Sequence, residues 1–493
     1  MKRVSKSAAG RLTAMTAILA LLSACGGGGS SGSIGGGGGG GTGAAPTPTP
    51  SGTCALRARQ DWVAAQMNEW YLFPETLPAN LNPASYSTVE AYLDALTAGA
   101  RAQNKDRFFT YLTSIAEENA YYNSGSSAGF GFRLALDGSN RLVITESFEG
   151  APALNAGVDR GAEIVSIGTT TSNLRTVSSI LSSEGTAGLN NALGTPAVGL
   201  TRVFQVRDAA GTRNVTLAMA DFTLTPVSAR YGAKVIDDAG RKVGYINLRT
   251  FINTAETPLR NAFANFKAQG ITDVIIDVRY NGGGLISIAD LVNNLLGADR
   301  TTSTVANYVT FRPSKASNNE TVYFAPQPQS IAPTRIAFIG TGGSASASEL
   351  VMNTFIPYLG NRAALVGTNT YGKPVGQIAI DRAACDDRLR VIAFALENSA
   401  HQGAYYNGLA AFMGATCQAN DDISRQLGDP QEQSTRRALD FLAGRSCTPI
   451  SASAAAGSPG LSPQAAGAQL GKPMELVSPD RPTTPQREVP GLY

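Results

Sequence analysis

The sequence predicts an α/β protein whose main core is preceded by a small helical region and a strand-rich module. Three patterns along the chain predict this organisation. Apolar residues recur at spacings of three and four within residues 54–122, as they do in amphipathic helices. Short apolar segments punctuated by glycine and asparagine fill residues 123–225 and indicate strands. Strand and helix patterns then alternate through residues 226–450, which is the order of an α/β fold.

Each part contains elements that the local pattern predicts. The helical region has apolar stripes over Trp62–Leu72 and Val89–Leu96. The strand-rich module has predicted strands at Phe130–Leu134, Leu142–Ile144, Glu163–Ile167, Val203–Val206 and Val215–Leu217. In the core we expect, in order, strand Gly244–Leu248, helix Leu259–Phe266, strand Val274–Val278, helix Leu285–Leu296, strand Ile336–Ile339, helix Ser348–Ile356 and strand Ala364–Val366. Functional groups are expected in the loops after these core strands.

Composition and charge exclude several classes of function. Only 16% of the 493 residues are charged, the formal net charge is +3, and no basic stripe is present, so nucleic acid is not an expected partner. The chain has a single histidine, His401, which excludes a multi-histidine metal site. His401 lies in a polar, turn-like stretch, so the base of any hydrolytic reaction is expected elsewhere. We expect no metal and no cofactor.

The N-terminal residues carry an export signal. Basic residues precede an apolar run that is too short to span a bilayer, so residues 1–24 read as a signal peptide. The run ends Leu-Ser-Ala before Cys25, which resembles the lipobox of bacterial lipoproteins and makes Cys25 the predicted lipidation site; the alternative is an ordinary secretory signal with an incidental cysteine. Residues 25–53 are rich in glycine, serine and proline and predict a tether, so the folded part is expected to hang from a membrane.

Four cysteines remain after Cys25, namely Cys54, Cys385, Cys417 and Cys447. An even number in an exported protein favours two disulfides, for which three pairings exist, and buried free thiols are the alternative. Residues 451–493 are rich in alanine, glycine, serine and proline without a period, so they are expected to form a disordered tail.

Three segments at strand ends could carry chemistry. Gly282, Gly283 and Gly284 lie between a strand and a helix, where glycine amides can face a developing negative charge, although a tight turn needs the same residues. A serine-rich turn precedes the helix at Ser348, and serine there also suits a helix N-cap. The third segment contributes Lys373 between apolar stretches. A buried lysine can lose its proton near neutral pH and activate a serine.

Together these segments resemble a known family. Gly-Ser-Ala-Ser-Ala-Ser-Glu at residues 343–349, followed by Tyr-Gly-Lys at 371–373, resembles the Ser-Lys signature of the carboxyl-terminal processing (tail-specific) proteases. Asp277–Gly284 resembles the glycine-rich oxyanion segment of that family. Residues 129–132 and 156–164 resemble parts of its PDZ domain. The resemblance runs from Asp61 to Gly444 and implies a crotonase-like spiral ββα protease core with a preceding or inserted PDZ-like domain.

The resemblance also implies roles for individual residues. Ser346 would be the nucleophile, Lys373 the general base and Gln377 the residue that orients the lysine amine, with Ser344 and Ser348 structural. The oxyanion donors would be the N–H groups of Ala347 and of Gly284 or Gly283. The carboxylate-binding loop of the PDZ-like domain would consist of Gly129, Phe130, Gly131 and Phe132.

The function that follows is a serine endopeptidase with a Ser-Lys dyad. It would cleave exported proteins at or near their C-terminal tails, and its partners would be proteins or peptides with free C-termini and, through the lipid anchor, a membrane. The expected location is the bacterial cell envelope, facing the periplasm or the cell exterior, with the outer membrane as the expected membrane. A binding protein that captures tails without cutting them is the main alternative. A small-molecule or acyl-thioester enzyme on a similar core is the third, and it gives no reason for the PDZ-like module.

Overall fold

The computed structural model of the chain describes residues 52–451 and 474–493, which belong to one compact unit spanning residues 50–493. The predicted signal peptide, Cys25 and nearly all of the tether lie outside the described residues. Among the helices that are described, none is both long and apolar enough to cross a membrane.

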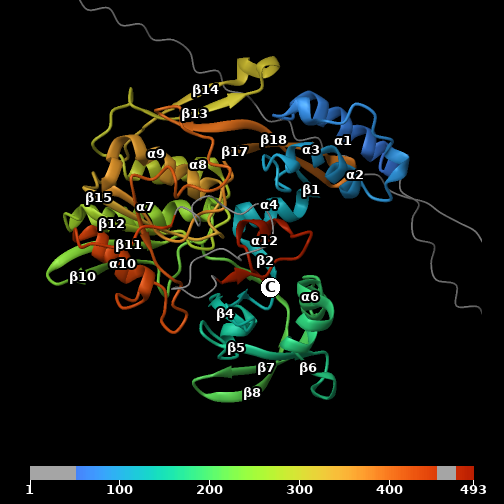
Figure 1. Cartoon of the computed structure of the whole chain (residues 1–493), viewed down its shortest axis with the longest axis horizontal. Helices are drawn as coiled ribbons and strands as arrows, with labels where there is room; N and C mark the ends of the chain where they lie inside the picture. The colour runs from blue at the N-terminus through green and yellow to red at the C-terminus, as the bar shows by residue number, and fades with distance from the viewer. Residues whose placement is uncertain (1–51, 452–473) are drawn as a thin grey trace, which may run out of the picture. The chain divides into compact units, whose positions relative to one another are not determined.

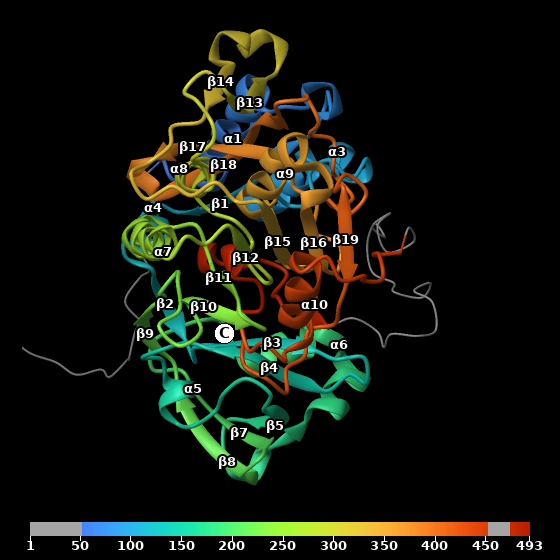
Figure 2. The same cartoon turned by 90° about the vertical axis from the view of Figure 1, so that its left-hand side faces the viewer.

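The core is built on a six-stranded sheet with the order β10-β11-β12-β15-β16-β19. Strands β11 to β19 pair in parallel, and β10 is antiparallel to β11. Figure 2 shows β12, β15, β16 and β19 side by side. The strands are β10 (Ala233–Asp238), β11 (Arg241–Asn247), β12 (Asp273–Asp277), β15 (Arg335–Gly340), β16 (Ala363–Gly367) and β19 (Ala415–Gln418).

Helices cover both faces of this sheet, as expected for an α/β fold. Apolar residues of α7, α8 and α9 share one buried cluster with Ile276 and Phe338, whereas those of α10 share another with Ile275 and Ile339. Neighbouring residues of one strand therefore face opposite helical layers. The helices are α7 (Glu256–Ala268), α8 (Ile286–Leu295), α9 (Ala347–Leu359) and α10 (Gln433–Leu442). Strands β11, β12, β15 and β16 and helices α7, α8 and α9 agree with those expected from the sequence, within a few residues at each end, whereas β10, β19 and α10 were not predicted.

A second sheet of five strands carries the helical region. Its long strand β18 pairs with β1, β13 and β17, and β14 extends the sheet from β13. Met67 of α1 and Tyr71, the residue after it, share one buried cluster with Val391 and Ile392 of β18, so the helical region lies on this sheet. The strands are β1 (Tyr111–Ser114), β13 (Val305–Phe311), β14 (Glu320–Tyr323), β17 (Val375–Arg382) and β18 (Asp387–Asn398). The helices of this region are α1 (Leu56–Trp70), α2 (Val89–Leu96), α3 (Ala98–Ala102) and α4 (Ile115–Ser124).

The strand-rich module follows α4. Its main sheet has the order β20-β3-β4-β5-β7-β8, with β6 on β5, and β2 pairs separately with β9. Helix α6 packs Ile180 and Leu189 against Phe130, Phe132 and Phe204 in one apolar cluster. The strands are β2 (Ser126–Gly129), β3 (Phe132–Leu136), β4 (Leu142–Ser147), β5 (Glu163–Gly168), β6 (Arg175–Thr176), β7 (Thr201–Asp208), β8 (Gly211–Ala218) and β9 (Ala220–Thr223), and the helices are α5 (Pro152–Asn155) and α6 (Val177–Leu193).

The expectation of a disordered tail does not hold for residues 474–493. These residues form β20 (Glu475–Leu476) and α12 (Thr484–Glu488), and β20 pairs with β3. Helix α12, dark red in Figure 1, lies beside α4. Composition misled the prediction because the few apolar residues of this segment, Val489 and Leu492 among them, are buried against the rest of the molecule. Residues 452–473 lie outside the described residues.

Both predicted disulfides are present, and the structure decides the pairing. Cys54 is bonded to Cys385, which joins the start of the helical region to the turn before β18. Cys417 on β19 is bonded to Cys447, which lies after α10.

Candidate active site

Ser346 lies in the turn between β15 and α9, directly before the first residue of the helix. Its backbone has φ 54° and ψ −114°, in the left-handed region that costs free energy for a residue with a Cβ atom. A sharp strained turn of this kind between a strand and a helix lifts a serine hydroxyl out of the surrounding backbone. A Cβ atom placed on Gly283 would come within 2.8 Å of the Ser346 Cβ atom, so glycine lets the two turns pack closely.

The two flanking serines have structural roles, as expected. The Ser344 hydroxyl donates to the Val278 carbonyl oxygen at 2.8 Å, and the Ser348 hydroxyl donates to the Asn281 carbonyl oxygen at 2.9 Å. Both side chains are buried, whereas Ser346 is partly exposed. The flanking serines therefore fix the turn between β15 and α9 (the serine turn) to the turn at Gly282–Gly284 (the glycine turn). Of the three serines, Ser346 is the one whose hydroxyl remains accessible.

Lys373 lies between β16 and β17, where the sequence places it after a strand end. Its Nζ atom donates to Gln377 Oε1 at 3.0 Å, and the Gln377 amide in turn donates to the Phe109 carbonyl oxygen. The Phe109 ring lies 5.3 Å from Nζ. Burial lowers the pKa of Lys373 below its ordinary value, while the charge of Glu488 opposes this shift. The neutral amine is therefore more accessible than in a lysine exposed to water.

Glu349 connects the serine turn to the lysine segment. Its Oε2 atom accepts the Ser346 N–H at 3.0 Å and the Lys373 N–H at 2.7 Å. Its Oε1 atom accepts the Thr370 hydroxyl and the Gly372 N–H, both at 2.6 Å. Because one fully buried carboxylate accepts hydrogen bonds from the backbones of Ser346 and Lys373, it fixes the position of these two residues relative to each other.

The amides of the glycine turn differ in whether they already have a hydrogen-bond partner. The Gly283 N–H donates to Asn281 Oδ1 at 2.9 Å and is therefore already paired. The Gly282 N–H donates to the Glu488 carbonyl oxygen at 2.9 Å. Within the described residues, the N–H groups of Gly284 and Ala347 have no hydrogen-bond partner. The predicted oxyanion residues Gly283, Gly284 and Ala347 thus belong to two adjoining turns.

The loop at residues 129–132 of the strand-rich module holds a main-chain oxygen. The N–H groups of Gly131 and Phe132 donate to the Tyr493 carbonyl oxygen at 2.8 and 3.3 Å. Gly131 has φ 78°, a conformation that glycine adopts without strain. The side chains of Phe130 and Phe132 are fully buried and stack with each other. In this loop, the backbone N–H groups are the hydrogen-bond donors, and the two phenyl rings form the apolar surface beneath them.

A cavity of about 1110 Å³ adjoins these residues. Lys373, Tyr371, Gly282 and Ala345 line it on the core side, and Arg107 with Phe109 lines it from the helical region. Residues 474–476 and 486–488 of the last segment also line it. The cavity is large enough for several residues of an extended peptide and reaches the predicted base.

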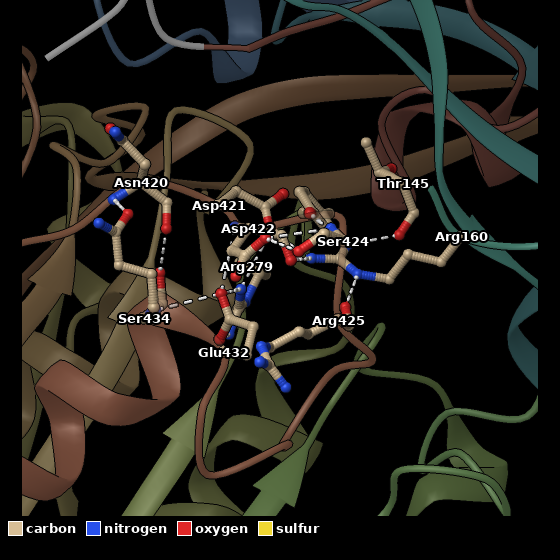
Figure 3. A network of polar contacts seen from close by, with 12 residues as sticks. Thr145, Arg160, Arg279, Asn420, Asp421, Asp422, Ser424, Arg425, Glu432 and Ser434 are labelled. Carbon is tan, nitrogen blue, oxygen red and sulfur yellow. Dashed lines mark hydrogen bonds and ion pairs between the residues drawn. The ribbon is translucent and has the colours of Figure 1, made fainter. Parts of the chain in front are cut away.

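An ion-pair network links the strand-rich module to the strand before the glycine turn (Figure 3). Arg160 of the module and Arg279 of the core both bond Asp421 Oδ1, at 2.6 and 3.0 Å. Arg279 also pairs with Asp277 and, through both oxygens, with Glu432. Burial acts to raise the pKa of Glu432, but the charge and hydrogen bonds of Arg279 outweigh it and lower that pKa to about 2. Glu432 therefore stays ionised beside Arg279, and the network holds the module against the core.

Sequence reasoning missed three parts of this site. Glu349 stands three residues after Ser346, a Ser-x-x-Glu spacing that signals a helix capping box and could have drawn attention to it. Phe109 gives no local signal, because its carbonyl contacts Gln377 from a distant part of the chain. The segment 474–493 was predicted to be disordered from its composition.

His401 is exposed, with its ring 3.0 Å from Glu397 Oε2 and stacked on Tyr308.

Comparisons with known proteins agree with the resemblance. Residues 242–397 match Peptidase family S41, and residues 58–111 match the Peptidase S41 N-terminal domain. Over 307 residues, 61% of this chain and 54% of the relative, the chain is 28% identical to carboxyl-terminal-processing peptidase 3 (chloroplastic) of Arabidopsis thaliana. Over 254 residues, 51% of this chain and 54% of the relative, it is 27% identical to the carboxyl-terminal-processing protease of Synechocystis. The chain thus spans about half the length of the curated relatives it matches.

A solved structure shares the fold. The crystal structure of a protein from Bacteroides fragilis that is named as an S41 protease superposes with a TM-score of 0.61 at 22% identity, covering 78% of this chain and 97% of that protein. At this identity the match supports the mixed α/β fold alone.

Proposed function

Because the chain belongs to the S41 family of carboxyl-terminal processing serine peptidases, we propose that it is an endopeptidase that cleaves proteins at or near their C-terminal tails. In this proposal, Ser346 is the nucleophile, Lys373 is the general base and Gln377 orients the amine. One observation carries the proposal: the buried Glu349 carboxylate binds the backbones of both members of the dyad through a single oxygen.

The proposed reaction proceeds by acyl transfer. The neutral Lys373 amine takes the proton of the Ser346 hydroxyl as the serine oxygen attacks the scissile carbonyl carbon. The protonated lysine then gives its proton to the leaving amine, and water attacks the resulting ester by the reverse of the same steps. Gln377 Oε1 accepts from the amine at 3.0 Å and so aims its lone pair while the lysine is neutral.

The negative charge of the tetrahedral intermediate needs donors that are already in place. We assign this role to the Ala347 N–H and to an amide of the glycine turn, with Gly284 favoured because the Gly283 N–H is already paired with Asn281. Amides of this kind contribute on the order of 100-fold or more in rate each, because they need no reorganisation during the reaction.

In the same proposal, the strand-rich module is a PDZ-like domain that receives the substrate tail as an added strand on β3. The N–H groups of Gly131 and Phe132 support this, since they already hold a main-chain oxygen at the start of β3, along the edge with which β20 pairs. The buried rings of Phe130 and Phe132 favour an apolar or aromatic last residue.

The proposed location is the bacterial cell envelope, with a lipid on Cys25 and the folded part facing the periplasm or the exterior. The two disulfides, Cys54–Cys385 and Cys417–Cys447, support export because such bonds persist in oxidising compartments. Protein or peptide substrates would then be exported chains with accessible tails.

The test uses the compact unit 50–493 with an unstructured reporter that ends in an apolar residue, and mass spectrometry reads the fragments. We expect cleavage by the unaltered protein, no cleavage by Ser346→Ala or Lys373→Ala, and normal cleavage by the exposed control Lys242→Ala. Binding of the reporter without cleavage from pH 6 to 9 would favour a protein that only captures tails. Cleavage that survives Ser346→Ala would refute the assignment of the nucleophile.

A further inference from the structure

Both ends of the segment 474–493 form backbone hydrogen bonds with strand β3 of the module. Its first residues pair antiparallel with β3, with Leu476 opposite Ala135, and the Val477 N–H donates to the Leu134 carbonyl oxygen at 3.0 Å. Its last residues return to the other half of β3. The Leu134 N–H donates to the Gly491 carbonyl oxygen at 2.9 Å, and the Tyr493 N–H donates to the Phe132 carbonyl oxygen at 3.0 Å. The segment therefore takes up the edge of β3.

Between these two pairings, the segment passes over the catalytic side of the molecule. The Glu488 carbonyl oxygen accepts the Gly282 N–H, and a Cβ atom on Gly282 would come within 2.2 Å of the Arg487 carbonyl oxygen. The Arg487 guanidinium lies 3.9 Å above the Tyr111 ring. The Glu488 carboxyl accepts the Tyr122 hydroxyl at 3.0 Å. Helix α12 is thus seated directly against the glycine turn.

The last two residues fill apolar sites of the module. Tyr493 is 2% exposed, packs in the cluster of Phe130 and Phe132, and its hydroxyl donates to Asn190 Oδ1 at 2.5 Å. Leu492 is equally buried, beside Phe148 and other residues at the base of the loop. Side chains buried to this degree stabilise the bound position of a segment that has little regular structure of its own.

The charge at the centre of the segment also acts on the proposed base. Burial raises the pKa of Glu488, and the charge of Lys373 opposes that rise; the charge of Glu488 in turn opposes the lowering of the Lys373 pKa by burial. The obstruction of the site by the segment rests on its occupation of the cavity and of the edge of β3.

We propose that residues 474–493 are an intramolecular ligand of the substrate groove, which consists of the cavity of about 1110 Å³ and the adjoining edge of β3. A substrate must displace this segment before it reaches Ser346. The proposal rests on the proposed function, because that function is what makes this cavity a site for substrate. It also names the class of segment that the groove accepts: an extended segment with an aliphatic residue followed by an aromatic one, whose carbonyl oxygen accepts from the amides of Gly131 and Phe132.

The expected size of the effect follows from the fact that the segment and its site belong to one chain. A covalently connected ligand has an effective concentration on the order of 1 mM at its site. If the free segment binds with a dissociation constant of about 10 μM, the apparent kcat/KM for a competing substrate falls about 100-fold. Weakening the segment therefore raises activity, whereas a segment that serves only as structural support would lower activity when removed.

The first experiment measures binding and needs no catalysis. In the unit 50–493 carrying Ser346→Ala, residues 474–493 are deleted, and a fluorescent peptide with the sequence of 474–493 is titrated by anisotropy. We expect saturable binding to the shortened protein, at least tenfold weaker binding to the protein that retains its own segment, and at least tenfold weaker binding of a peptide with Tyr493→Asp. Equal binding to both proteins would overturn the proposal.

The second experiment measures activity with Ser346 present and keeps the segment, in case the deletion prevents folding. Tyr493→Asp is compared with Glu320→Gln, an exposed residue of β14 that does not line the cavity. We expect Tyr493→Asp to raise kcat/KM on the unstructured reporter at least tenfold and Glu320→Gln to leave it unchanged. A folded Tyr493→Asp protein with unchanged or lower kcat/KM would overturn the proposal. Peptide binding with no cleavage by any form would instead refute the proposed peptidase and leave the intramolecular ligand standing.

Discussion

Glu349→Gln is the substitution that most directly tests how the dyad is held. The carboxylate accepts two hydrogen bonds on each oxygen, at 2.6 to 3.0 Å. A glutamine keeps the shape but replaces one oxygen by an NH2 group. With the NH2 group toward Ser346 and Lys373, the amides of both residues lose their acceptor. Turned the other way, the NH2 group faces the Gly372 N–H, whereas the Thr370 hydroxyl can turn to accept from it, so the first orientation is the one that unties the dyad.

The loss can be estimated from these contacts. Each hydrogen bond to a charged group contributes about 1.5–3 kcal/mol, so losing two lowers the free energy of unfolding by about 3–6 kcal/mol. The effect on catalysis is separate, because a displacement of about 1 Å between nucleophile and base costs on the order of 100-fold in rate. We therefore expect Glu349→Gln to reduce kcat about 100-fold, with a much smaller change in KM.

The assay combines urea unfolding with steady-state cleavage of the unstructured reporter. Glu320→Gln, a substitution of an exposed carboxylate, is the matched control and should change neither quantity. A Glu349→Gln protein that is destabilised as expected but keeps kcat within threefold would refute the reasoning, since Glu349 would then support the fold without positioning the dyad. Unchanged stability would show that the four hydrogen bonds carry little net free energy.

Three further predictions concern the base, the network and the disulfides. Because burial lowers the pKa of Lys373, kcat/KM should rise with pH as the ammonium loses its proton, with a midpoint below 10.5 in a pH-rate profile; a midpoint at or above 10.5 would contradict the assignment. Asp421→Asn removes the buried carboxylate that Arg160 binds at 2.6 Å and should lower the free energy of unfolding by about 3–5 kcal/mol in urea. Removing the Cys54–Cys385 disulfide by replacing both cysteines with serine should lower the free energy of unfolding in urea by about 2–5 kcal/mol; equal stability would refute its role.

The sequence determined the elements of the core and the residue types of the site. Strand and helix patterns over residues 226–450 predicted the alternating elements because the period of apolar residues is local and follows from backbone geometry. The structural roles of Ser344 and Ser348 agree with the positions that the motif implied for them. The number of disulfides followed from counting cysteines, and their pairing did not, since pairing depends on which loops meet in space.

Tertiary structure alone decided how these residues work together. The link from Ser346 to Lys373 passes through Glu349, and no spacing along the chain shows that one carboxylate reaches both. Residues 474–493 looked disordered because their composition cannot build a core of their own, yet they are ordered by apolar sites and an open strand edge that other parts of the chain provide. Local pattern reports what a segment can form by itself, whereas burial and hydrogen bonding between distant segments decide what it becomes in the folded molecule.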